Sequence, residues 1–240
     1  MSATMTDTSG IVLYDLAGAD ADLRFSPHCW KVRMALAHKG LDVQTVPWRF
    51  TEKEAIAFSG QQLVPILVDQ GEVVSDSWKI ATHLEARYPD RPSLFGGKAG
   101  EALARFVNSW ADASLVPAIA KLMLLDIHAC IHDKDRDYFR ASREKRFGMT
   151  LEAITADTAA RRSDVQQALM PLRLMLRDQP FIAGDAPAYA DYCVFGMLMW
   201  ARCVGSADVL EADDRVYAWR ERLLDAFGGL ARGASVATAA

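Results

Sequence analysis

The stretch SPHCWK, residues 26–31, decides which fold this sequence predicts. It follows a short apolar run, Ile11 to Tyr14, that is typical of a strand buried on both faces. Ser26 and Pro27 then form a common helix start, because serine caps the first turn and proline fits the first helical position. Ser26 and Cys29 also have the spacing of a redox Cys-x-x-Cys turn, with a hydroxyl in place of the first thiol.

More strand and helix signals surround this turn in the first part of the chain. Val43 to Trp48 is typical of a second strand, and a two-residue turn separates two further strands, 65–69 and 72–75. So short a turn predicts an antiparallel hairpin. A helix over 76–88 follows and ends where Pro89 begins a new segment. The predicted order is strand, helix, strand, a weakly helical segment, two strands and a helix.

The rest of the chain is predicted to be helical. A proline- and glycine-rich linker, 89–98, separates an N-terminal domain, 1–88, from a C-terminal domain, 99–240. The stretch 191–204 is almost wholly apolar and has amphipathic neighbours, which indicates the core helix of a bundle. One long helical segment contains Pro117, which predicts a kink.

The composition excludes several classes of protein. The chain has 240 residues, 51% of them hydrophobic, and a net charge of -4 without a basic cluster, so we do not expect it to bind nucleic acid. The first ten residues lack the apolar core of a signal peptide, and the most apolar stretch, 192–204, is too short to span a bilayer. The four cysteines lack a disulfide or zinc-ligand spacing. We therefore expect a cytoplasmic protein without a membrane partner, disulfides or a bound metal.

Two further motifs follow the Ser26 turn at characteristic separations. Val64-Pro65 precedes the third strand, and Asp76-Ser77 begins the helix after the hairpin. In this order the three motifs resemble the glutathione S-transferase superfamily, and the resemblance covers essentially the whole chain. It implies a thioredoxin-like α/β N-terminal domain, an all-α C-terminal helical bundle, glutathione as the cosubstrate and a homodimer.

The resemblance implies that Ser26 is the catalytic residue. The first turn of a helix has unsatisfied N–H groups and a partial positive charge, which favour the thiolate form of a thiol bound beside it. A hydroxyl that donates a hydrogen bond to the sulfur stabilises the thiolate further. The nucleophile would then arrive with glutathione, whereas Ser26 keeps only the activating role. The alternative is that Ser26 caps the helix and does nothing more.

The other two motifs would bind the rest of glutathione. The family has a cis proline at the position of Pro65, and such a bond turns the N–H and C=O of Val64 outward, where they can pair with the tripeptide backbone. Asp76 and Ser77 would hold the γ-glutamyl ammonium and carboxylate groups beside a helix N-terminus. A trans proline at a strand start is the alternative for Pro65, and helix capping by Asp76 is compatible with binding.

The chain also departs from the family pattern before the Val-Pro pair. Leu63 occupies a position where many members have lysine or glutamine, and Gln62, one residue earlier, is assigned to glutathione binding instead. Arg49 or Lys53 could meet the glycyl carboxylate, although solvation at the surface explains both side chains equally well.

The segment before the core helix departs from the pattern as well. Gly184 to Asp191 matches the segment that begins this helix in the family, but Ala188 stands at the capping position. Asp191 must then satisfy the helix start without a capping box.

Four other residues have two interpretations each. Cys29 is predicted to be a buried, inert cysteine, the alternative being a mixed disulfide with glutathione. His28 is predicted to face solvent, although it could act as a general base. His128 and His132 are four residues apart on a helix but have no third ligand nearby, so no metal site is predicted.

Within the superfamily the sequence most resembles the bacterial β-aryl etherases and the similar fungal etherase-like transferases. The resemblance lies in the first-helix motif and in three stretches, 74–81, 88–95 and 135–140. It implies attack of glutathione thiolate on a hydrophobic, aromatic electrophile, with β-aryl ether cleavage as the finer assignment. Two alternatives stay open: a non-catalytic protein that binds glutathione or hydrophobic ligands, and a glutathione-dependent thiol reductase that uses Cys29. The serine in the attacking position of the turn argues against the reductase.

Overall fold

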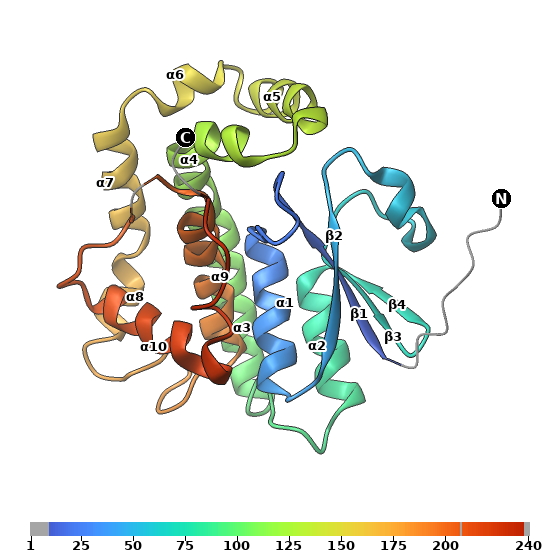
Figure 1. The fold of residues 1–240 in the computed structure, drawn as a ribbon. Helices are drawn as coiled ribbons and strands as arrows, with labels where there is room; N and C mark the ends of the chain where they lie inside the picture. Colours follow the sequence, from blue (N-terminus) through green and yellow to red (C-terminus); the bar gives the residue numbers. More distant parts are fainter. Residues whose placement is uncertain (1–9, 207, 238–240) are drawn as a thin grey trace.

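The computed structural model describes residues 10–206 and 208–237, which form an N-terminal and a C-terminal part (Figure 1). The expectation that no signal peptide is present concerns residues 1–9, which lie outside the described chain. The N-terminal part contains, in order, β1 (Ile11–Leu16), α1 (Pro27–His38), β2 (Val43–Trp48), the 3-10 helix η1 (Lys53–Ser59), β3 (Ile66–Asp69), β4 (Glu72–Ser75) and α2 (Ser77–Arg87).

The sheet of the N-terminal part has the strand order β2-β1-β3-β4. β1 runs parallel to β2 and antiparallel to β3, and β4 runs antiparallel to β3. Leu13 of β1 pairs with Thr45 on one side and Leu67 on the other, and its side chain is fully buried. These strand directions confirm the predicted thioredoxin-like unit, including the hairpin of β3 and β4.

The C-terminal part is built from helices, which confirms the predicted helical bundle. They are α3 (Lys98–Trp110), the π-helical turn η2 (Ala111–Leu115), α4 (Val116–Cys130), α5 (Asp133–Phe147), α6 (Leu151–Thr155), α7 (Thr158–Ala168), α8 (Met170–Met175), α9 (Tyr189–Val204) and α10 (Arg215–Gly229).

The π-helical turn η2 joins α3 to α4 just before Pro117. Proline has no N–H to donate to the carbonyl four residues earlier, and its ring collides with that carbonyl in a regular α-helix. The wider π turn relieves this conflict. The sequence predicts a kink at Pro117, and the structure has a widened helical turn just before it. This turn directs Asp112 toward the N-terminal part.

The helical run Lys98–Cys130 is long and apolar enough, by length and composition alone, to cross a membrane. Its most apolar 18-residue window has a mean hydropathy of 1.5, and 33% of that window is buried. In the fold, α3 and α4 both pack against α9, as the helices of a bundle do.

α9 is buried along nearly its whole length, and α1 packs directly along it (Figure 1). The two backbones come close at Gly196, where a Cβ atom would lie 2.3 Å from the carbonyl oxygen of Pro27. Glycine alone has no Cβ, so it lets the first turn of α1 rest on α9 at this distance. The C-terminal part therefore supports the turn that carries Ser26.

The carboxylate of Asp191 organises the start of α9. Its Oδ2 accepts a hydrogen bond from the backbone N–H of Ala188 (3.1 Å), which is the half of a capping box that needs no side chain at the cap. Its Oδ1 accepts from the N–H of Ile182 (2.8 Å) and from Nε1 of Trp219 (2.9 Å). Asp191 is fully buried. It therefore satisfies the helix start, as the sequence predicts, and also ties α9 to α10.

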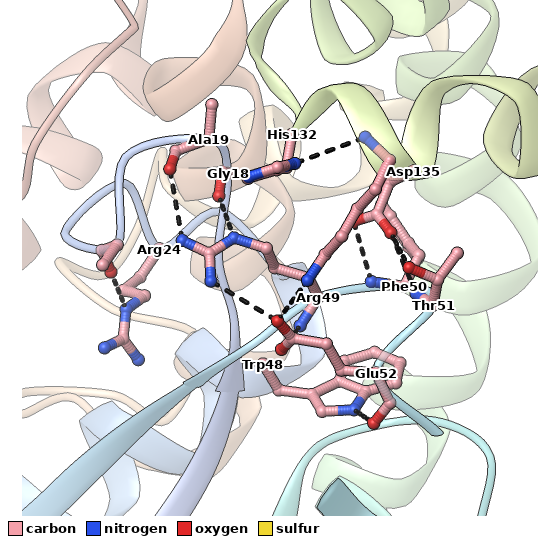
Figure 2. Close-up of polar contacts among 12 residues, drawn as sticks. Gly18, Ala19, Arg24, Trp48, Arg49, Phe50, Thr51, Glu52, His132 and Asp135 are labelled. Carbon is pink, nitrogen blue, oxygen red and sulfur yellow. Dashed lines mark hydrogen bonds and ion pairs between the residues drawn. The ribbon is translucent and has the colours of Figure 1, made fainter. Parts of the chain in front are cut away.

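Asp135 joins the two parts of the molecule just after β2 (Figure 2). Its carboxylate accepts hydrogen bonds from the N–H of Phe50 (3.1 Å), the N–H of Thr51 (2.9 Å) and the hydroxyl of Thr51 (2.6 Å). Lys134 and Glu52 form an ion pair across the same junction, with 2.6 Å between Nζ and Oε1. Asp135 is fully buried. These contacts hold the segment after β2 against the start of α5 and fix the position of Phe50.

Candidate functional site

Ser26 caps α1 through its hydroxyl oxygen, and the cap itself does not use the hydroxyl proton. Its Oγ accepts a hydrogen bond from the backbone N–H of Cys29 at 3.2 Å, as an N-cap does. A hydroxyl has two acceptor lone pairs and one O–H donor, so this cap leaves the O–H available for an anion. The helix N-terminus adds its own partial positive charge. The turn therefore combines a donor with a field that favours a bound thiolate.

Cys29 is fully buried in the same turn. Burial, and next the negative charge of Asp15, raises the pKa of the Cys29 thiol well above its usual range. A reactive cysteine needs an accessible, readily ionised thiol. The structure thus agrees with the prediction of an inert cysteine and argues against a reductase that attacks through Cys29.

His28 agrees only in part with the prediction that it faces solvent. Its side chain is 40% exposed and lines two neighbouring cavities. Burial, together with the nearby positive charge of Lys31, lowers the pKa of His28 to about 4. The imidazole is therefore neutral at neutral pH and can accept a hydrogen bond or a proton where the two cavities meet.

The larger of these cavities, about 570 Å³, is a polar groove between the N-terminal part and α3. We call it the polar groove. Three of the residues predicted to bind glutathione, namely Val64, Asp76 and Ser77, line it together. Arg105 of α3 lines it as well, with its guanidinium carbon 4.8 Å from the ring centroid of Trp78. The groove thus brings together an acid, a base and backbone groups that suit a zwitterionic peptide.

Asp76 caps α2 with only one of its carboxylate oxygens. Its Oδ1 accepts hydrogen bonds from the N–H groups of Trp78 (3.0 Å) and Lys79 (3.1 Å). Within the described chain Oδ2 accepts none, so it is free to accept a hydrogen bond from a ligand. The backbone of Asp76 has a positive φ of 80°, which aspartate adopts more often than most residues other than glycine. Ser77 is buried, and its carbonyl accepts a hydrogen bond from the hydroxyl of Tyr189 (2.8 Å).

The Val64-Pro65 peptide bond is cis, as the family resemblance implies. Both residues line the polar groove. In the part of the chain that the structure describes, the N–H and C=O of Val64 make no backbone hydrogen bond. A buried backbone normally pairs these groups, so the pair is available to an extended peptide laid along the groove.

An ion pair between a buried lysine and a partly exposed aspartate, which the sequence analysis missed, lies at the wall of the groove. Lys31 is fully buried, and its Nζ donates to Oδ1 of Asn108 (2.8 Å) and Oδ1 of Asp112 (3.0 Å). Asn108 in turn donates from Nδ2 to Oδ2 of Asp112 (2.9 Å). Asp112 lies in the π turn before Pro117. This proline is therefore the part of the local sequence that could have indicated an irregular turn at Asp112. The network joins α1 to α3 beside the groove.

Three other predicted candidates lie elsewhere. Gln62 is exposed and is not among the described residues that line the groove, whereas Gln61 is. Arg49 donates to the carbonyls of Gly18 (3.0 Å) and Ala19 (3.2 Å), as Figure 2 shows, and these bonds occupy its guanidinium. Lys53 donates to the carbonyl of Gln62 (2.6 Å). Of the three basic residues Arg49, Lys53 and Arg105, it is therefore Arg105 that lines the groove.

The smaller cavity, about 240 Å³, is mostly apolar and opens beside Ser26. We call it the acceptor cavity. His28, Leu63 and Val64 line both cavities, so the two meet at the N-terminus of α1. Aromatic side chains from four elements or their ends dominate the wall of the acceptor cavity: Phe25, Trp48, Phe50, Phe139, Phe147 and Trp200.

Helix α5 contributes residues to the acceptor cavity that the sequence analysis did not assign. They are Phe139, Arg143, Arg146 and Phe147. Their spacing of four, three and one residues places them on one face of a helix. That periodicity was the available signal, but the many charges of this segment are equally typical of a solvent-exposed helix.

His132 has a structural role that explains its position. Its Nδ1 accepts a hydrogen bond from the N–H of Lys134 (3.3 Å) and so caps α5 (Figure 2). Among the residues that the structure describes, no group of three His, Cys, Asp or Glu side chains is arranged to hold a metal ion.

Family models match both parts of the chain. The model described as glutathione S-transferase, N-terminal domain, matches residues 21–92, and the model described as glutathione S-transferase, C-terminal domain, matches residues 102–227. The two matches include all the described residues that line the polar groove and all but Leu16 of those that line the acceptor cavity.

Two curated proteins illustrate the range of relatives. The chain is 30% identical over 140 residues to the glutathione S-transferase-like protein ustS of Aspergillus flavus, which covers 52% of this chain and 49% of that protein. It is 28% identical over 190 residues to maleylacetoacetate isomerase of Pseudomonas aeruginosa, which covers 76% of this chain and 80% of that protein. The chain thus spans about half the length of the first relative.

Solved structures share the architecture. A glutathione S-transferase of Ceriporiopsis subvermispora in complex with glutathione has a TM-score of 0.83 and 24% identity, covering 92% of this chain and 98% of that one. A glutathione transferase from Phanerochaete chrysosporium has a TM-score of 0.73 and 25% identity, covering 92% and 94% of the two chains. At 24% identity the first likeness shows the fold alone.

Proposed function

The chain belongs to the glutathione S-transferase family, whose cosubstrate is glutathione, and from this premise we propose that it joins the glutathione thiolate to a hydrophobic, aromatic electrophile. Ser26 carries the proposal. Its hydroxyl, whose proton the helix cap does not use, lies at the N-terminus of α1, where the polar groove and the acceptor cavity meet. A thiol held in the groove would reach this turn with an electrophile in the cavity beside it.

The proposed reaction has few steps, because the protein supplies position and electrostatics. The groups of the polar groove hold glutathione: Asp76 and Ser77 at the γ-glutamyl ammonium and carboxylate, Val64 at the cysteinyl backbone, and Arg105 at a carboxylate. The thiol loses its proton to solvent or to His28, and Ser26 donates a hydrogen bond to the thiolate. The sulfur then bonds to the electrophilic carbon, and the bond from that carbon to the leaving group breaks. For a β-aryl ether, the leaving group would be an aryloxide.

This proposal also assigns the parts of the chain. Residues 1–88 would hold glutathione, 89–98 would link the domains, and 99–240 would supply most of the acceptor cavity. A cytoplasmic location belongs to the same proposal, since a reducing compartment keeps both glutathione and the four free cysteines reduced.

A screen of the purified protein with glutathione tests the function. The panel contains a β-aryl ether dimer, simple aryl halides and maleylacetoacetate, because one relative is named for isomerising the last compound. Glutathione-dependent turnover of any member supports the enzyme, and turnover of the ether supports the etherase assignment. Binding of glutathione and hydrophobic ligands without turnover would instead favour the storage protein.

Asp76→Asn should raise the KM for glutathione about tenfold and leave kcat within about twofold. Asparagine caps helices as well as aspartate does, so α2 should stay intact. The amide lacks the negative charge that would bind the ammonium group, and a hydrogen bond to a charged group contributes about 1.5–3 kcal/mol. Steady-state kinetics with varied glutathione measure this change. An unchanged KM would show that the ammonium group binds elsewhere.

We also propose a homodimer, and two exposed apolar side chains of α3 support it. Phe106 of α3 is 71% exposed and Leu103 is 37% exposed, and exposed apolar surface of this kind marks association sites. Light scattering should give twice the chain mass of 26.5 kDa. Phe106→Glu should give the mass of one chain, whereas Leu174→Glu, at another exposed leucine, should leave the dimer intact. A wild-type mass of one chain would contradict the dimer.

A further inference from the structure

We infer that the electrophile carries an anionic group, a carboxylate on its aromatic ring, and that Arg143 and Arg146 bind this group in the acceptor cavity. The inference rests on the proposed function and names the substrate class of that site. It starts from an imbalance of charge. Among the described residues that line the cavity, these two arginines are charged and no side chain is acidic.

The other arginines of α5 show what is unusual about this pair. Arg136 is 3.2 Å from Asp133, and Arg140 lies 3.0 Å from Glu144 and 2.8 Å from Glu152. Arg143 and Arg146 have no carboxylate within 4.0 Å in residues 10–206 and 208–237, although the whole chain has a net charge of -4. The helix thus pairs the arginines that point away from the cavity and leaves unpaired the two that line it.

Arg143 is held in place by aromatic rings rather than by an acid. Its guanidinium carbon lies 4.7 Å from the ring centroid of Phe139 and 5.6 Å from that of Phe50, and its Nη1 donates to Oγ of Ser142 (2.9 Å). Phe50 is itself fixed by the hydrogen bonds of Asp135. Burial also lowers the pKa of Arg143, which reflects a cation without a compensating anion. The remaining N–H donors of its planar fork are available to a ligand.

The chemistry of the cavity selects an aryl carboxylate. Guanidinium groups bind carboxylates through two parallel hydrogen bonds, and such charge-assisted bonds are the strong ones. The rings of Trp48, Phe139 and Phe147 offer an apolar, aromatic wall for the remainder of the acceptor. Ser26 lines the same cavity. One ligand could therefore present its carboxylate to α5 and its reactive carbon to the thiolate.

A matched pair of electrophiles tests this inference. The probes are 4-chloro-3,5-dinitrobenzoate and 4-chloro-3,5-dinitrobenzamide, which differ only in the charged group. In both, the glutathione sulfur bonds to the carbon that holds chlorine, chloride leaves, and the thiol proton passes to the buffer. The quantity compared is the ratio of kcat/KM for the benzoate to kcat/KM for the benzamide, each divided by the rate of the uncatalysed reaction.

Arg143→Gln should lower this normalised ratio about tenfold, because it removes the paired donors and the charge. Arg143→Lys should restore part of it, since lysine keeps the charge but not the planar fork. Arg136→Gln is the matched control: it removes the same charge from the same helix outside the cavity, and it should leave the ratio unchanged. An unchanged ratio in Arg143→Gln and in the double variant with Arg146→Gln would overturn the inference. So would an equal fall for both probes, which is the result of a purely structural role beside Phe139.

Binding of an unreactive pair separates this inference from the proposed function. Calorimetry with 4-hydroxybenzoate and 4-hydroxybenzamide requires no turnover. The wild type should bind the benzoate more tightly, and Arg143→Gln should abolish the preference. If no electrophile is conjugated but this preference is found, the proposed function fails and the anion site stands. If conjugation occurs but neither pair shows a preference for the carboxylate, the anion site fails alone.

Discussion

Ser26→Ala should raise the pKa of bound glutathione by about one to two and lower turnover at neutral pH about ten- to a hundredfold. A hydrogen bond to a charged group contributes about 1.5–3 kcal/mol, and each pKa unit corresponds to about 1.4 kcal/mol. The O–H of Ser26 can turn to make this bond without loss of the cap, because the cap uses only a lone pair of Oγ. The thiolate form should then dominate only at higher pH. The pH profile of kcat/KM with an aryl halide measures the shift directly.

Two further variants make the Ser26 result specific. Ser26→Thr keeps a capping hydroxyl and should retain most of the activity. Cys29→Ala should also retain activity, because the thiol is buried and its pKa is raised. Loss of activity in Cys29→Ala but not in Ser26→Ala would favour the reductase. Losing the cap costs about 1 kcal/mol of stability, so rates must be compared at a temperature where all variants are folded. If folded Ser26→Ala conjugates glutathione as fast as the wild type, the thiol is activated by the backbone N–H groups of the turn and not by Ser26.

Asp191→Ala should lower the free energy of unfolding by about 3–5 kcal/mol and the melting temperature by about 10 °C or more. The substitution removes four hydrogen bonds at once and leaves buried donors, including the N–H of Ile182 and Nε1 of Trp219, without an acceptor. Each unsatisfied buried donor costs about 1–3 kcal/mol, and such costs are not strictly additive. Urea unfolding followed by circular dichroism measures the change.

Asp157→Ala provides the control for Asp191→Ala. Asp157 is an exposed N-cap of α7 that accepts one hydrogen bond, from the N–H of Ala160 (2.9 Å). Its loss should cost only about 1 kcal/mol. Equal effects of the two substitutions would mean that burial and the link between α9 and α10 add nothing to the role of Asp191.

The features that the sequence predicted well depend on neighbouring residues. The Ser26-Pro27 helix start, the β3–β4 hairpin and the cap at Asp76 each follow from a few adjacent positions, and the structure contains all three. The family resemblance added the cis peptide bond at Pro65. The local sequence alone is compatible with either a cis or a trans bond there. These local signals gave the order of strands and helices along the chain, whereas the family resemblance implied that Val64, Asp76 and Ser77 share one site.

The features that the sequence did not predict depend on contacts between distant segments. The charge of Arg49 would suit a carboxylate ligand. Its guanidinium, however, donates hydrogen bonds to the carbonyls of Gly18 and Ala19, about thirty positions earlier in the chain. The pairing of Lys31 with Asp112 and the position of His28 where two cavities meet depend on how α1 meets α3. The same holds for Arg143, since only the packing of α5 against Phe50 and Thr51, just after β2, decides whether its charge faces solvent or a cavity. No spacing within one helix contains that information.

The contact at Gly196 has a consequence for how the chain is made. Its partner α1 ends at His38, but α9 ends at Val204, more than 160 residues later. At 5–20 residues per second the ribosome needs about 8–30 s to produce the intervening segment. During that interval the surface of α1 that finally lies on α9 has no partner, and exposed apolar surface of this kind invites aggregation. The turn that bears Ser26 would thus gain its packing partner only when α9, one of the last helices to emerge, has left the ribosome. Until then this turn would lack the support that it has in the folded protein.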